Sequence, residues 1–116
     1  MPSPIESFLI RNLPVPIREW LVKARNIGRN IPGTATVNGK TFQVLPHKFW
    51  IGFNKGEWEP DLNRFFSKYV DQGKTVLDIG SWLGPSVFTA VSRNAKKIIA
   101  VEAHPETYSL LKTNIQ

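Results

Sequence analysis

The sequence predicts an α/β fold built around one βαβ unit in the carboxyl-terminal half of the chain. Residues 76–79 and 98–101 are short apolar runs, typical of strands that are covered on both faces in a parallel sheet. Two glycines between them allow a tight turn, and Pro85 suits the first position of a following helix. The order strand, glycine turn, helix and strand indicates that the two strands pair in parallel.

Length and composition indicate one globular domain. The chain has 116 residues, of which 41% are hydrophobic and 21% are charged. It has no cysteine, which excludes disulfides and thiol catalysis, and His47 and His104 show no metal-ligand spacing, so we expect no metal site. The net charge of +6 is scattered along the chain, so a solvated basic surface explains it better than a nucleic-acid site does.

Residues 1–33 are predicted to form a helical segment. Ser3, Pro4 and Glu6 have the pattern of a capping box, which begins a helix that ends near Asn12. A second helix, ending at Gly28, is indicated by apolar residues at helical spacing, namely Ile17, Trp20, Leu21 and Ala24. There is no signal-peptide pattern and no apolar run long enough to span a membrane, so we expect a cytoplasmic protein.

Residues 34–56 are predicted to form a β-hairpin with a strand extension. Asn38-Gly39 separates the β-prone residues 34–37 and 40–45, and this dipeptide is the strongest short signal for a hairpin turn. Residues 49–53 are rich in aromatic side chains and indicate a third strand. A turn is expected at residues 54–56.

Residues 57–116 are predicted to contain three helices around the two parallel strands. The first helix begins near Pro60 and ends before Gly73, the second covers residues 85–94, and the third begins at Pro105. Each has an apolar stripe that we expect to be buried. The stripes are Leu62, Phe65, Phe66, Tyr69 and Val70; Val87, Phe88 and Val91; and Tyr108, Leu111 and Ile115.

The acids at the ends of the two strands indicate a nucleoside site. Asp78 and Glu102 lie at the carboxyl ends of the strands, where ligands bind in open α/β sheets. The glycine turn does not supply the G-x-G-x-x-G of a dinucleotide fingerprint, because only Gly80 and Gly84 are present. The spacing therefore favours a nucleoside ligand other than a dinucleotide.

Two stretches carry a resemblance to a known family. VLDIGSWLG at residues 76–84 and VEAHPETYSLLKTNI at residues 101–115 resemble the FkbM-type methyltransferases. This family carries D-I-G-x-x-x-G, followed by an E-x-x-P segment that runs into L-L-K-x-N-I. It belongs to the class I S-adenosylmethionine-dependent methyltransferases, and the resemblance extends only loosely to the residues before position 76.

The resemblance implies a Rossmann-like class I methyltransferase fold, with S-adenosylmethionine as the cofactor and a sugar or another small molecule as the methyl acceptor. The family's sheet has seven strands, and only the first two are recognisable here. We therefore expect residues 57–116 to be the start of a methyltransferase domain that is truncated after its second strand. The alternative is that self-association or a partner completes the sheet. No catalytic residue can be named.

The candidate cofactor-binding residues are Asp78, Gly80, Ser81, Trp82, Gly84, Glu102 and Ala103. We expect the N–H groups of the glycine turn to bind the methionine carboxylate, and Asp78 to help hold the ammonium group and the turn, directly or through water. Glu102 would accept hydrogen bonds from the ribose hydroxyls, since a carboxylate only accepts. Ala103 would lie along the adenine. Trp82 would pack either over the methionine portion or on the helix that follows.

Two other functions fit the sequence less well. One is a non-catalytic interaction module built on half of a methyltransferase domain, which would bind partners through its hairpin and basic surface. The other is a fragment of an NAD-dependent oxidoreductase, which would use Glu102 on a ribose but lacks the glycine spacing.

Overall fold

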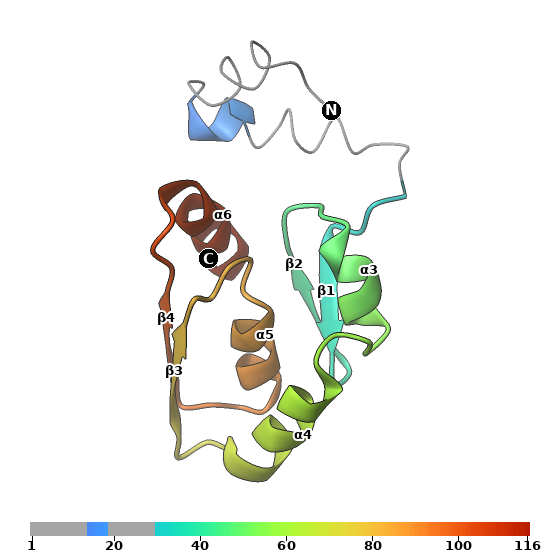
Figure 1. The fold of residues 1–116 in the computed structure, drawn as a ribbon, viewed down its shortest axis with the longest axis vertical. Coiled ribbons are helices and arrows are strands. Elements are labelled where there is room, and N and C mark those ends of the chain that lie inside the picture. The colour runs from blue at the N-terminus through green and yellow to red at the C-terminus, as the bar shows by residue number, and fades with distance from the viewer. Residues whose placement is uncertain (1–13, 19–29) are drawn as a thin grey trace.

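The computed structural model describes residues 14–18 and 30–116, which form a small mixed α/β domain (Figure 1). The elements are β1 (Thr34–Val37), β2 (Lys40–Gln43), α3 (Phe49–Asn54), α4 (Pro60–Tyr69), β3 (Thr75–Ile79), α5 (Pro85–Ser92), β4 (Lys97–Val101) and α6 (Pro105–Ile115). The helix predicted before residue 12 lies outside the described residues. Of the second predicted helix, residues 15–18 are helical and the remainder also lies outside them.

The predicted hairpin is confirmed. β1 and β2 pair antiparallel, with Val37 opposite Lys40. Both turn residues have positive φ, 50° at Asn38 and 76° at Gly39, as a two-residue hairpin turn of this sequence requires. β2 ends at Gln43, two residues earlier than the sequence indicates. The turn expected at residues 54–56 is also present, and Gly56 has a φ of 74°.

The third strand predicted at residues 49–53 is wrong, because these residues form helix α3. Trp50 and Phe53 are its two buried residues. They are three positions apart and so lie on one face of a helix, whereas in a strand they would point to opposite faces. A helix can bury both rings in one core, and this gain outweighs the preference of aromatic residues for strands.

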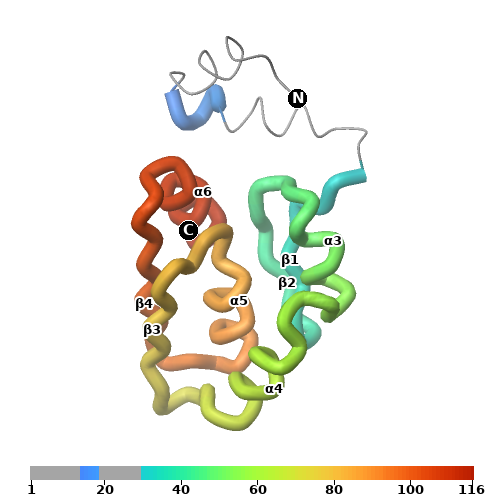
Figure 2. The backbone as a smooth tube through the Cα atoms, in the orientation of Figure 1, coloured from blue at the N-terminus to red at the C-terminus, as the bar shows by residue number. Residues whose placement is uncertain are grey.

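The predicted βαβ unit is confirmed. β3 and β4 pair in parallel, with Leu77 opposite Ile99 and Ile79 opposite Val101, and α5 connects them. Figures 1 and 2 show α5 between this sheet and the hairpin, and α5 contacts both β1 and the two parallel strands. One helix therefore joins the two sheets.

The expectation that both faces of the parallel strands are covered is wrong. Side chains alternate along each strand, so those at Leu77, Ile79, Ile99 and Val101 share one face. Their exposed fractions are 59%, 76%, 42% and 44% respectively. The side chains of the opposite face, at Val76, Asp78, Ile98 and Ala100, are half-buried, so the described part of the chain covers that face better than this one.

The three helical stripes are buried only in part. Phe66, Phe88 and Leu111 are buried as expected, and so is Val87. Leu62 and Val70 are half-buried, and the remaining members are exposed, contrary to the prediction: Phe65, Tyr69, Val91, Tyr108 and Ile115. A single layer of helices buries only the part of each stripe that faces a neighbouring element, so the edges of the stripes remain accessible to solvent.

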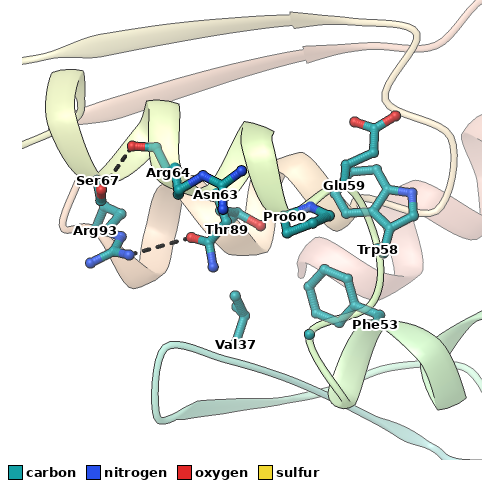
Figure 3. Close-up of a pocket in the computed structure, with 11 residues that line it drawn as sticks. Val37, Phe53, Trp58, Glu59, Pro60, Asn63, Arg64, Ser67, Thr89 and Arg93 are labelled. Carbon is teal, nitrogen blue, oxygen red and sulfur yellow. Dashed lines mark hydrogen bonds between the residues drawn. The ribbon is translucent and has the colours of Figure 1, made fainter.

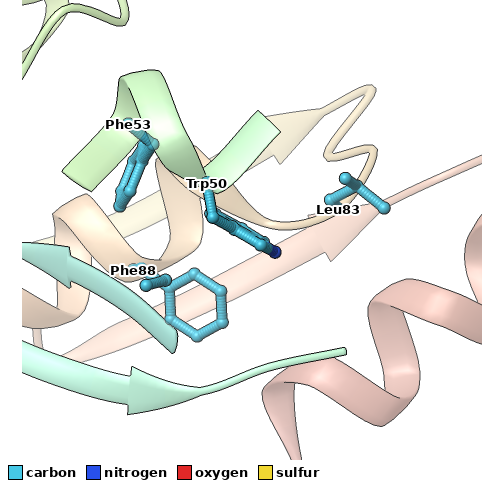
Figure 4. Close-up of a cluster of buried hydrophobic side chains, with 5 residues drawn as sticks. Trp50, Phe53, Leu83 and Phe88 are labelled. Atoms are coloured by element: carbon cyan, nitrogen blue, oxygen red, sulfur yellow. The ribbon is translucent and has the colours of Figure 1, made fainter. Parts of the chain in front are cut away.

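The main core joins the hairpin, α3 and the βαβ unit. Its buried members come from both predicted segments, 34–56 and 57–116, and they are Ala35, Trp50, Phe53, Leu83 and Phe88. Figure 4 shows the side chains of Trp50, Phe88 and Leu83 converging from α3, α5 and the glycine turn. The hairpin therefore contributes to the same core as the predicted site. Across residues 14–18 and 30–116, no helix combines the length and the hydrophobicity that crossing a membrane requires.

Candidate functional site

The glycine turn after β3 is fixed to the end of β4. The N–H groups of Gly80 and Ser81 both donate to the carbonyl oxygen of Val101, at 2.8 and 3.0 Å. Three residues of the turn have positive φ: Gly80 (82°), Trp82 (52°) and Gly84 (101°). Trp82 adopts this conformation although bulky residues rarely do so. The turn thus has a defined shape at the carboxyl edge of the parallel sheet.

Glu102 connects this turn to the loop after β4. Its Oε2 accepts a hydrogen bond from the Trp82 N–H at 2.9 Å, and its Oε1 accepts one from the His104 N–H at 2.9 Å. These donors hold the pKa of the Glu102 carboxyl below its ordinary value, the His104 N–H contributing most and the Trp82 N–H next. Each carboxylate oxygen can accept a further hydrogen bond.

We expect Glu102→Gln to change how the free energy of unfolding depends on acid pH. The folded pKa of Glu102 is lower than its unfolded value near 4.5, so its stabilisation is present above that value. This contribution is lost as the pH falls through the folded pKa. Urea unfolding between about pH 6 and pH 3 should therefore show a difference between wild type and variant that shrinks on acidification.

The titration of His47 does not change the difference in stability between wild type and Glu102→Gln. Burial, and then the charge of Lys48, lower the pKa of His47. Its contribution to stability is therefore present above its unfolded pKa of 6.5 and decreases as the pH falls below it. Both proteins contain His47, so its effect cancels in the difference. Parallel stability curves for wild type and Glu102→Gln would contradict the role assigned to Glu102.

The turn offers few free N–H groups for the methionine carboxylate that is expected there. Most of the N–H groups that would bind it already donate within the protein, namely those of Gly80, Ser81, Trp82 and Gly84. The acceptors are Val101, Glu102 and, for Gly84, the carbonyl oxygen of Ser81 at 2.8 Å. Sequence patterns do not reveal that these N–H groups are used, because two of the acceptors lie about 20 residues further along the chain, at the end of β4 (Val101) and just after it (Glu102).

In the described part of the chain, the direct hydrogen bond between Asp78 and the turn is made by its backbone. The turn is held there by the Ser81 hydroxyl, which donates to the Asp78 carbonyl oxygen at 2.9 Å. The Asp78 side chain instead lines a groove of about 400 Å³ beside α4, together with Phe65, Tyr69 and Ser86. Its Oδ2 is buried, with no hydrogen-bond partner in the described part of the chain. The structure therefore separates Asp78 from the exposed carboxylate of Glu102.

The Trp82 ring contacts residues at and just before the start of α3, a neighbourhood that the sequence does not indicate. Its ring packs edge-on against Phe49, with centroids 4.6 Å apart, and against His47 at 5.8 Å. His47 Nδ1 in turn accepts a hydrogen bond from the Phe49 N–H at 3.0 Å. Trp82 thus joins the turn to the start of α3, and His47, which the sequence indicates only as a loop residue, supports that contact.

Asn114 is a structural residue of the site that sequence reasoning missed. Its Nδ2 donates to the Leu83 carbonyl oxygen at 2.9 Å, and its Oδ1 accepts from the Leu45 N–H at 2.8 Å. The buried amide thereby joins α6, the glycine turn and the segment after β2. Ala103, by contrast, is exposed and follows Glu102 in the loop.

In residues 14–18 and 30–116, no group of three histidine or acidic side chains is placed to hold a metal ion. No protein-family model, curated protein or solved structure matches this chain.

Proposed function

We propose that the chain carries the nucleoside-binding part of an S-adenosylmethionine-dependent methyltransferase of the FkbM type, which it resembles. The observation that carries this proposal is the position of Glu102. Its carboxylate lies at the carboxyl end of the second parallel strand, fixed 2.9 Å from the N–H of the glycine turn after the first. An acid in this place of a βαβ unit is suited to a ribose diol.

The residues of the turn and of Glu102 fit the nucleoside part of the cofactor. Glu102 retains acceptor capacity for two hydroxyl donors. A Cβ at Gly80 would meet no atom within 4 Å, so there is open space beside the turn. The methionine carboxylate fits less well, because most of the turn's N–H groups already donate within the protein.

When bound, S-adenosylmethionine supplies a methyl group that its sulfonium already activates. The task of the protein is to align the acceptor with it, and alignment can lower a reaction barrier by about 7 kcal/mol or more. In this proposal Glu102 orients the ribose and Trp82 fixes the turn. The acceptor remains a sugar or another small molecule, as the resemblance suggests, and no base is assigned.

The proposal predicts that ribose hydroxyls determine affinity through Glu102. Calorimetric titration should give roughly tenfold tighter binding of adenosine than of 2′,3′-dideoxyadenosine, since charge-assisted hydrogen bonds are lost without the diol. Glu102→Gln should remove most of this preference. Glu57→Gln, which deletes one exposed carboxylate elsewhere, is the matched control and should retain it. Equal affinities for the two nucleosides in the wild type would overturn the proposal.

The same titration separates the proposal from a second candidate, a non-catalytic interaction module. The exposed apolar face of the β3–β4 sheet favours that alternative, because large apolar patches commonly mark interaction sites. Such a module would not discriminate between the two nucleosides. Tighter binding of NAD than of S-adenosylmethionine would instead indicate the oxidoreductase alternative.

A further inference from the structure

A second cavity lies at the other end of α5 from the glycine turn. Its volume is about 270 Å³, near the lower end of the range for small-molecule sites, roughly 300 Å³. Val37, Phe53 and Trp58 give it an apolar side, and Asn63, Arg64 and Arg93 give it a polar one. Figure 3 shows this division, with Arg93 and Asn63 away from the aromatic rings.

Arg93 is one of the two cationic residues that line this cavity. One terminal nitrogen of its guanidinium donates to Asn38 Oδ1 at 3.2 Å and to Asn63 Oδ1 at 3.4 Å. The two asparagines also bond each other, with Asn38 Nδ2 donating to Asn63 Oδ1 at 3.1 Å. They therefore fix the guanidinium between the hairpin turn, α4 and the end of α5.

The positive charge of Arg93 has no protein counter-ion in the part of the chain that the structure describes. Its acceptors are neutral amides, and its buried Nε has no hydrogen-bond partner there. The end of the α5 dipole supplies only about half a negative charge. An arginine with this environment gains from a bound anion, because a carboxylate supplies the full negative charge and the bidentate acceptor that the two amides lack.

The neighbouring charges do not neutralise Arg93. Arg64, the other cation that lines the cavity, is paired with Asp61 on the exposed side of α4. Glu59 lines the cavity at its aromatic end, and Figure 3 shows its carboxylate pointing away from Arg93. The cavity thus has a cationic end and an aromatic end.

The cavity is separate from the nucleoside site proposed above. Gly84 and Arg93 flank opposite ends of α5, and a rise of 1.5 Å per residue places them roughly 13 Å apart along the helix. A ligand in one site would not contact the other directly. The inference about the cavity consequently does not depend on the proposed function.

We propose that this cavity binds a small organic carboxylate with an aromatic or branched apolar body. The carboxylate contacts the Arg93 guanidinium, and the apolar body lies against Phe53, Trp58 and Val37. The volume limits the ligand to roughly ten non-hydrogen atoms, about the size of benzoate.

The test uses the 116-residue chain and three probes, benzoate, benzamide and acetate, followed by two-dimensional NMR. Benzoate should give saturable shifts at the Trp58 indole N–H and the amides of Val37 and Asn63, with a dissociation constant in the millimolar range, as expected for so small a ligand. Benzamide, which has the same shape but no charge, should bind about tenfold more weakly. Acetate should also bind more weakly, because it lacks the apolar body.

Variants of the arginine complete the test. Arg93→Gln should reduce benzoate affinity to that of benzamide, and Arg93→Lys should lose part of it, since lysine keeps the charge but not the planar fork. Lys112→Gln removes one charge at an exposed position of α6 and should leave binding unchanged. Benzoate shifts that do not saturate, or equal binding of benzoate and benzamide by the wild type, would overturn the proposal even if the variants failed to fold. Excess adenosine should not displace benzoate.

Discussion

Trp50→Ala is expected to lower the free energy of unfolding by about 3–5 kcal/mol, the usual cost of truncating a buried tryptophan. The Trp50 side chain is 0% exposed and lies against Phe53 and Phe88, with ring centroids 5.3 and 5.8 Å apart. Its Nε1 also donates to the Leu45 carbonyl oxygen at 3.2 Å. The substitution therefore leaves a cavity among α3, α5 and the hairpin and removes a hydrogen bond. Urea unfolding measures the change.

Two further substitutions separate the effect of the lost buried volume at Trp50 from that of the lost hydrogen bond. Trp50→Phe keeps an aromatic ring but loses the hydrogen bond and some volume, so a loss of about 1–2 kcal/mol is expected. Trp82→Ala makes the same chemical change as Trp50→Ala at a side chain that is 40% exposed, and it should cost less than about 1.5 kcal/mol. Equal losses at the two tryptophans would mean that burial of the side chain does not set the cost of truncating it.

The error at residues 49–53 shows where local sequence patterns cease to determine structure. Aromatic residues favour strands, and the preceding hairpin made a third strand a consistent extension. Trp50 and Phe53 instead lie on one face of a helix and pack in the core with Phe88 and Leu83. These two partners lie at least 30 residues further along the chain, so a local pattern does not include them. The hairpin turn and the βαβ unit were predictable because their signals lie within a few residues.

The candidate site was predictable to a similar extent. The turn and its closeness to Glu102 follow from the order of the elements. The order of the elements does not predict that the turn's N–H groups are used, because one acceptor, the Glu102 carboxylate, lies 20 positions after its donor, Trp82. Long-range side-chain contacts also decide the neighbours of Trp82. The exposed sheet face was missed because an apolar run indicates that a strand can be buried, and not which faces are covered.

Gly84→Ala is expected to lower the free energy of unfolding by about 2–4 kcal/mol. Gly84 has a φ of 101°, and a left-handed conformation costs a residue with a Cβ about 1–2 kcal/mol. The added Cβ would also lie 3.2 Å from Leu111 Cδ1 and 3.5 Å from Phe88 Cε2. Leu111 is buried in α6, so this overpacking adds about 1 kcal/mol or more.

Gly80→Ala and Gly56→Ala are the matched controls, because both glycines have positive φ but no atom within 4 Å of an added Cβ. Each should cost only the backbone strain, about 1–2 kcal/mol. The excess at Gly84 then measures how tightly the turn packs on α6. Equal losses at all three positions would mean that backbone conformation alone sets the cost and that α6 does not constrain the turn. A larger loss at Gly84 would mean that the shape of the turn depends on α6 as well as on Glu102.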